Sequence, residues 1–145
     1  LAEYLRGRLP GPDVTPQQLR DRSWWSGAEV FVLVDDYELV ATQSGNPLAA
    51  FADLVNQAGD IGLHIVVARS AGGAGRALFG DPIMAKMREA INPGLVMSGS
   101  KDEGTMFGDV KASPMPPGRG TLVTRAFKGL IQAAYRPSAQ EGSES

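Results

Sequence analysis

The segment EVFVLV at residues 29–34, apolar without a break from residue 30, most constrains the fold, and it ends in two aspartates, Asp35 and Asp36. The run is rich in β-branched residues and too short for a core helix, so it predicts a strand buried on both faces of a sheet. The segment LHIVVA, residues 63–68, has the same character. Because helical patterns separate the strands, the order predicts an α/β domain with a mostly parallel sheet and helices on both faces.

Three predicted helices begin with a capping residue followed by proline, at Thr15-Pro16, Asn46-Pro47 and Asp81-Pro82. An N-cap side chain and a proline at the first helical position are typical of helix starts. A further short helix is expected within residues 1–9, and the helix that begins at Asn46 is expected to end near residue 59. The later two helices have apolar residues at core spacing, namely Leu48, Phe51, Leu54, Val55, Ala58, Ile83, Met84, Met87, Ala90 and Ile91.

The second half of the chain predicts shorter strands at residues 95–97, 121–124 and 129–134. A few residues separate the last two, so we expect an antiparallel hairpin at the edge of the sheet. The predicted organisation is a helical lead-in over residues 1–22, a core over residues 23–136 and a disordered polar tail over residues 137–145.

Composition excludes several classes of site. The sequence has no cysteine and one histidine, which argues against a disulfide scaffold, a thiolate metal site and a multi-histidine metal centre. The net charge of −2 does not indicate a broad basic surface for nucleic acid. No apolar run approaches the roughly 20 residues of a membrane-spanning helix.

The aspartate pair is the strongest candidate for chemistry. Ligands of open α/β sheets bind at the carboxyl ends of the strands, which is where Asp35 and Asp36 are predicted to lie. In phosphate-binding ATPases the first acid of such a pair holds Mg²⁺, usually through water, and the second polarises the attacking water. The alternative is that both aspartates only end the strand and cap the next turn.

Other candidates surround this pair. Arg69, at the exit of the second strand, is placed to meet a phosphate, and the segment at residues 116–120 fits either a turn or a loop close to a ligand. His64 is expected to be a core residue, and Trp24-Trp25 a packing anchor. The sequence lacks the phosphate-cradling pattern G-x-x-x-x-G-K-[ST], so an ATP site built on the acid pair would take that loop from a region upstream of residue 1.

Taken in order, the segments VDDYELV, DIGLHIVVARS, PGLVMSGSKDEG and PPGRGTLV resemble the FtsK/SpoIIIE-type ATPases over about residues 23–135. Within that group the chain is similar to a C-terminal ATPase domain of EccC, the motor protein of type VII (ESX) secretion. The resemblance implies the second half of a RecA-like fold, binding of ATP and Mg²⁺ together with the upstream half, and a place in the cytoplasm at the inner face of the cell membrane.

The resemblance also assigns residues. It implies that Asp35 is the Walker B aspartate and metal ligand, and that Asp36 stands where hydrolytically active relatives have glutamate. Aspartate is one methylene shorter, which implies weak hydrolysis. Arg69 and Ser70 stand where DNA-translocating relatives have the segment Thr-Gln-Arg-Pro, so the chain departs from those relatives at the predicted γ-phosphate contact. The resemblance places nucleotide contacts at Asp35, Arg69, Ser70, Gly118 and Gly120.

For partners, the resemblance implies other ATPase domains of the same motor, a hexamer in the full assembly, and small secreted WXG100-type proteins. Membrane association through other parts of the protein is expected, and nucleic acid is not. A helical export signal needs an apolar docking surface, for which the candidates are Leu78, Phe79, Met84 and Met87; the alternative is that both methionines are core. Two other functions stay open, an FtsK-like DNA translocase module and an interaction domain with no nucleotide role.

Overall fold

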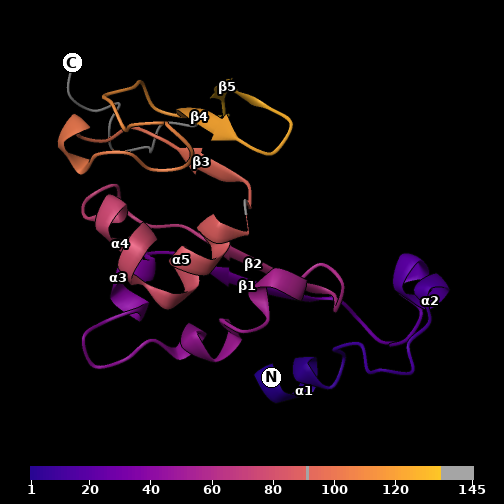
Figure 1. Cartoon of the computed structure of the whole chain (residues 1–145). Helices are drawn as coiled ribbons and strands as arrows, with labels where there is room; N and C mark the ends of the chain where they lie inside the picture. The colour runs from indigo at the N-terminus through magenta and orange to yellow at the C-terminus, as the bar shows by residue number, and fades with distance from the viewer. Residues whose placement is uncertain (91, 135–145) are drawn as a thin grey trace. The chain divides into compact units, whose positions relative to one another are not determined.

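Two short sheets organise the chain (Figure 1). In this computed structural model, which describes residues 1–90 and 92–134, β1 (Val30–Val34) pairs in parallel with β2 (Leu63–Val67). The other sheet is antiparallel and consists of β3 (Gly94–Val96), β4 (Arg119–Val123) and β5 (Lys128–Gln132). The α/β class is therefore confirmed.

The chain divides into two compact units. The first consists of Leu1–Ser70 and Phe79–Ala90, and the second of Ala71–Leu78 with the described residues from 92 to 134. None of the helices in the described part of the chain has the length and apolar character needed to span a membrane. The helical elements, in chain order, are α1 (Ala2–Arg6), α2 (Pro16–Asp21), α3 (Tyr37–Val40), the 3₁₀ helices η1 (Pro47–Phe51) and η2 (Val55–Gln57), α4 (Ala74–Gly80), α5 (Pro82–Glu89) and the 3₁₀ helix η3 (Lys101–Glu103).

The core of the first unit lies on one face of the β1–β2 sheet. Successive strand residues point to opposite faces, so only alternate side chains of each strand reach this core. The fully buried members come from α1, the segment before β2, and β2 itself: Leu5, Leu54, Ile61 and Leu63. Val30, Val32 and Ile65 of the two strands pack against them.

The expectation that both faces of these strands are buried is wrong for this structure. Phe31, Leu33 and Val66 are 62%, 70% and 55% exposed. They occupy the face opposite the core, which no described element of this unit covers enough to bury them.

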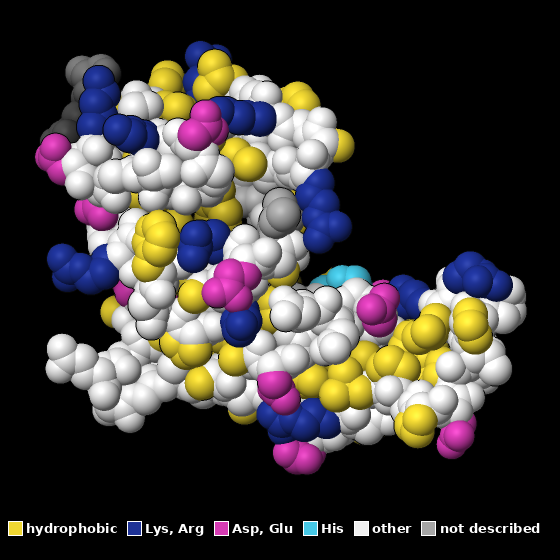
Figure 2. All heavy atoms as spheres, in the orientation of Figure 1, with side chains coloured by type: hydrophobic (Ala, Val, Ile, Leu, Met, Phe, Trp, Pro, Cys, Tyr) yellow, Lys and Arg dark blue, Asp and Glu magenta, His cyan; other side chains and the backbone are white. Residues whose placement is uncertain are grey.

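Hydrophobic side chains also gather on the surface over the N-terminal segment that carries α1 and α2 (Figure 2).

The C-terminal hairpin is confirmed, but not at the predicted edge. Among the described residues β4 and β5 pair with each other and with β3, in a sheet separate from β1 and β2. These three strands follow one another in sequence, and consecutive strands usually pair. Gly120 in β4 allows this pairing to be close, because a Cβ there would lie 2.9 Å from the Val96 carbonyl oxygen.

The predicted helix starts are confirmed. The Thr15 hydroxyl and the Gln18 side chain form a capping box, and Asp81 accepts hydrogen bonds from two amides of α5. The segment after Asn46 is the exception, because it forms 3₁₀ turns rather than an α-helix. In this segment the Ala50 carbonyl accepts a hydrogen bond from the Arg6 side chain. The Leu54 N–H donates to Phe51 O, three residues back, whereas in an α-helix it would donate to the carbonyl four residues back. Ile91 and the tail predicted at 137–145 lie outside the described residues.

Candidate functional site at the ends of two parallel strands

The acid pair lies at the carboxyl end of β1, as the sequence predicts. Both aspartates are exposed, and the Asp36 amide donates to Asp35 Oδ1 at 3.0 Å. Asp36 adopts the left-handed conformation, with φ 45° and ψ 50°. Aspartate enters this region more readily than most residues with a side chain. The turn at Asp36 therefore ends the strand and presents two accessible carboxyl groups.

The exit of β2 lies beside this turn. The Tyr37 amide donates to the Ala68 carbonyl at 3.0 Å, and Ala68 N–H donates to Val34 O at 2.8 Å. One residue on, the Glu38 carboxylate accepts from Ser70 N–H at 3.1 and 3.4 Å. A hydrogen bond with the Ser70 side chain, and then main-chain hydrogen bonds that include this one, lower the pKa of Glu38. The structure therefore brings the acid pair and the segment at residues 69–70 to one edge of the sheet.

Glu38 was missed by the sequence analysis as a site residue. Its carboxylate ties the β2 exit to α3, and the Arg69 side chain folds back so that its Nε donates to Ser70 O at 3.2 Å. The only sequence signal was position, because Glu38 follows the acid pair in the motif VDDYELV.

The residues at this edge fit the metal end of a Mg²⁺–nucleotide site. Mg²⁺ prefers oxygen ligands, keeps several waters and commonly uses one or two carboxylates together with substrate phosphates. Asp35 offers such a carboxylate at an accessible strand end. No group of three or more acidic, histidine or cysteine side chains able to hold a metal occurs in the described ranges 1–90 and 92–134. A site here would thus be completed by water and phosphate oxygens.

Two glycines predicted to contact nucleotide belong to the second unit and have a packing role there. Gly118 has φ +75°, and a Cβ would lie 2.6 Å from the Ala133 carbonyl oxygen. A Cβ at Gly120 would lie 2.9 Å from Leu95 Cδ1. Both positions thus need glycine for turn conformation and close strand pairing. A nucleotide contact at either stays a prediction.

The four candidate docking residues differ in accessibility. Leu78 of α4 and Met84 of α5 are buried, which favours the core role that the sequence left open. Met87 is half-buried. Phe79 is 64% exposed, and the Arg88 guanidinium stacks 4.3 Å from the centre of its ring. Phe79 and Met87 are therefore the members that a partner can reach.

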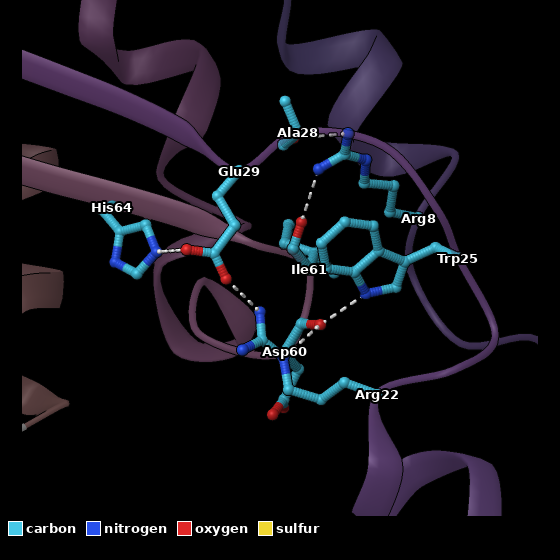
Figure 3. Close-up of polar contacts among 8 residues, drawn as sticks. All are labelled: Arg8, Arg22, Trp25, Ala28, Glu29, Asp60, Ile61 and His64. Atoms are coloured by element: carbon cyan, nitrogen blue, oxygen red, sulfur yellow. Dashed lines mark hydrogen bonds and ion pairs between the residues drawn. The ribbon is translucent and has the colours of Figure 1, made fainter.

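A buried arginine anchors the N-terminal segment, and the sequence analysis missed it (Figure 3). Arg8 is 4% exposed and donates to the carbonyl oxygens of Ala28 and Ile61 at 2.9 and 3.1 Å. Its guanidinium carbon lies over the rings of Tyr4 and Trp25, 4.7 and 4.2 Å from their centres. The expectation that the tryptophan pair anchors this segment is confirmed, because Trp25 stacks on the buried arginine.

His64 is not the core residue that the sequence predicts. Its side chain is half-buried, and its Nε2 lies 3.0 Å from a Glu29 carboxylate oxygen (Figure 3). Its ring stacks on Phe31, with ring centres 4.4 Å apart. Arg22 pairs with the same glutamate at 3.1 Å. The hydrogen bonds from His64 and then Arg22 lower the pKa of Glu29. His64 lies on the exposed face because it alternates with the core residues of β2.

Comparisons with known proteins bear on this arrangement. The chain is 58% identical over 135 residues to the ESX secretion system protein EccC of Thermomonospora curvata, a match that covers 92% of this chain and 10% of that protein. The structure of the cytoplasmic domain of the type VII secretion ATPase EccC from the same organism matches with a TM-score of 0.88 at 56% identity, covering 94% of this chain and 16% of that one. The chain matches a C-terminal ATPase domain of EccC.

A further match is to the structure of EccC ATPases 2 and 3 of Thermomonospora curvata in complex with a signal sequence peptide. Its TM-score is 0.87 at 56% identity, and it covers 94% of this chain and 24% of that one. No family model matches the chain. The chain spans about a tenth of the length of the EccC relative described above, so it corresponds to one part of the EccC ATPase region.

Proposed function

We propose that this chain is the Walker B half of a nucleotide-binding ATPase domain in an EccC motor of type VII secretion. The observation that carries the proposal is the exposed acid pair at the carboxyl end of β1, next to the exit of a parallel strand. Asp35 would hold Mg²⁺, and Asp36 would face the attacking water. Bound Mg²⁺–ATP would supply the phosphoryl group, and Arg69 and Ser70 would contribute to binding it. Gly118 and Gly120 of the second unit are kept as predicted nucleotide contacts.

The proposed domain hydrolyses ATP weakly and regulates the motor. A water-orienting carboxylate must reach its water, and the Asp36 side chain is short and extends from a left-handed turn. Asp36→Glu, in a protein that also contains the phosphate-binding loop, should therefore raise ATP turnover. General-base positioning is worth about 10²–10⁴-fold in rate, and the segment at residues 69–70 limits the gain to less than that. Unchanged steady-state turnover would place the defect away from Asp36.

The division of roles between the two aspartates has a direct test. In the same longer protein, Asp35→Ala should abolish the Mg²⁺-dependent part of nucleotide affinity, and Asp36→Ala should leave it intact. The reason is that a metal ligand acts in the bound ground state, whereas a water-orienting acid acts in the transition state. Calorimetric titration with and without Mg²⁺ measures both, and equal losses for the two variants would refute the assignment. The 145-residue chain alone should bind Mg²⁺–ATP poorly.

We also propose that the domain docks export substrates of the small helical WXG100 type. One EccC structure similar to this chain contains a signal sequence peptide, which supports substrate contact by this kind of domain. Phe79 and Met87 are the accessible candidates. Titration of a fluorescent signal peptide should show weaker binding for Phe79→Ser and Met87→Ser together. The matched control is Leu39→Ser, at an exposed leucine outside the candidate set; affinity that survives the double change would show that the receptor lies elsewhere.

The wider assignment follows from the family. We propose residues 1–22 as a lead-in and 23–136 as RecA-like core, a hexameric assembly with other ATPase domains, and a position at the inner face of the cell membrane, with membrane attachment through other parts of the protein. A DNA translocase is the second candidate. The net charge of −2 disfavours it, and duplex DNA retained in a filter-binding salt series would favour it instead.

A further inference from the structure

A buried hydrogen-bonded triad lies directly after the acid pair. Tyr37, the residue that follows Asp36, is 1% exposed. Its hydroxyl donates to Asp81 Oδ1 at 2.8 Å and accepts from Asn46 Nδ2 at 2.6 Å. The same Asn46 nitrogen donates to Asp81 Oδ2 at 3.0 Å, which closes the triad.

Each member of the triad also fixes the start of a helical element. Tyr37 is the first residue of α3. The Asn46 side chain accepts from the Leu48 amide at the start of η1. Asp81 Oδ1 accepts from the Ile83 and Met84 amides, each at 2.9 Å, at the start of α5. Three elements that are distant in sequence therefore begin at one hydrogen-bonded point.

The hydrogen bonds of the triad restrict movement at this point, because the Tyr37 side chain is buried. The main chain of Tyr37 is held as well, because the Tyr37 amide donates to Ala68 O at the β2 exit. Movement of the Asp36 turn thus requires the loss of buried hydrogen bonds.

We propose that Tyr37, Asn46 and Asp81 form a coupling element that links the position of the acid pair to the N-terminus of α5, with Tyr37 as a positioning residue for Asp35 and Asp36. The inference goes beyond the proposed function, and only the test by ATP affinity described below rests on that function. Through the triad, a change at α5 is transmitted to the turn that presents the two carboxylates.

Amide hydrogen exchange on the chain without nucleotide tests the coupling itself. Tyr37→Phe should speed exchange about fivefold, the factor that one typical hydrogen bond contributes, both at the Ile83 and Met84 amides and at the Tyr37 and Leu39 amides beside the acid pair. The matched control is Tyr4→Phe, which removes the hydroxyl that bonds Arg8 and should leave all four amides unchanged. Faster exchange on one side only, or on neither, would overturn the proposal.

A second residue of the triad tests the coupling from the α5 side. Asp81→Asn keeps the Oδ1 acceptor of both the Tyr37 hydroxyl and the α5 amides and loses only the hydrogen bond from Asn46, so exchange at Tyr37, Leu39, Ile83 and Met84 should change by less than about twofold. Asp81→Ala removes that acceptor, and exchange should rise about fivefold at Tyr37 and Leu39 as well as at the α5 amides. Unchanged exchange at Tyr37 and Leu39 in Asp81→Ala would show that the acid-pair turn does not depend on the triad.

A final arm measures Mg²⁺-dependent ATP affinity in the protein that contains the phosphate-binding loop. Tyr37→Phe should weaken this affinity about fivefold and leave the Mg²⁺-independent part unchanged. If the exchange results hold but Asp35→Ala leaves Mg²⁺-dependent binding intact, the nucleotide function is wrong and the coupling stands. If Asp35→Ala abolishes it while Tyr37→Phe has no effect, the positioning role of Tyr37 is wrong.

Discussion

Replacing Arg8 by methionine should destabilise the first unit by about 2–3 kcal/mol. The variant keeps an unbranched apolar chain but loses three hydrogen bonds, to Ala28 O, Ile61 O and the Tyr4 hydroxyl, worth about 1 kcal/mol each. It also loses two ring contacts worth about 0.5–1 kcal/mol each. Relief of the buried Nε, which has no hydrogen-bond partner among the described residues, offsets part of this loss.

Urea unfolding followed by tryptophan fluorescence suits this variant, because Trp24 and Trp25, the two tryptophans of the sequence, both lie in the first unit. At a typical urea dependence of about 1–3 kcal/mol per molar, the midpoint should fall by about 0.7–3 M. Arg22→Met is the matched control, and its partly exposed pair with Glu29 predicts a loss below about 1 kcal/mol. Equal midpoints for the two variants would refute the structural role given to the buried arginine.

Two further variants probe the same region. Gly62→Ala should lower the free energy of unfolding by about 2 kcal/mol or more, because φ is +70° there and a Cβ would lie 2.5 Å from the Trp25 ring. Gly59→Ala, where a Cβ would meet no atom within 4 Å, should leave the urea midpoint unchanged. Glu29→Gln should lower the urea midpoint at about pH 7 but not at about pH 3. The hydrogen bond from His64 lowers the Glu29 pKa, so its contribution is present above the unfolded value of 4.5 and lost as pH falls through the folded one. A deficit of equal size at both pH values would contradict this.

Features set by neighbouring residues were predictable from the sequence. The caps at Thr15, Asn46 and Asp81 hydrogen-bond to amides two or three residues on, so a short pattern contains the whole interaction. The acid pair was predictable for the same reason, because an apolar strand that runs into two aspartates places them at its end.

Features that depend on distant partners were not predictable. The 3₁₀ turns after Asn46 coincide with a hydrogen bond from Arg6, which lies 44 residues from Ala50. The burial of Arg8 depends on carbonyl groups 20 and 53 residues away. Charged side chains are rarely buried, so no sequence pattern predicts that this one is. The partners of Tyr37 lie 9 and 44 residues along the chain. Such contacts follow from the fold rather than from spacing.

The open face of the β1–β2 sheet has a practical consequence for handling the chain. Phe31, Leu33 and Val66 lie on one surface, and among the described residues each of these strands pairs only with the other, so both outer edges keep free main-chain donors and acceptors. Apolar surface beside unpaired strand edges is a template for adding further strands. Light scattering on the purified chain should therefore record a particle size that increases with protein concentration. A non-denaturing detergent, which covers exposed apolar surface, should prevent this increase.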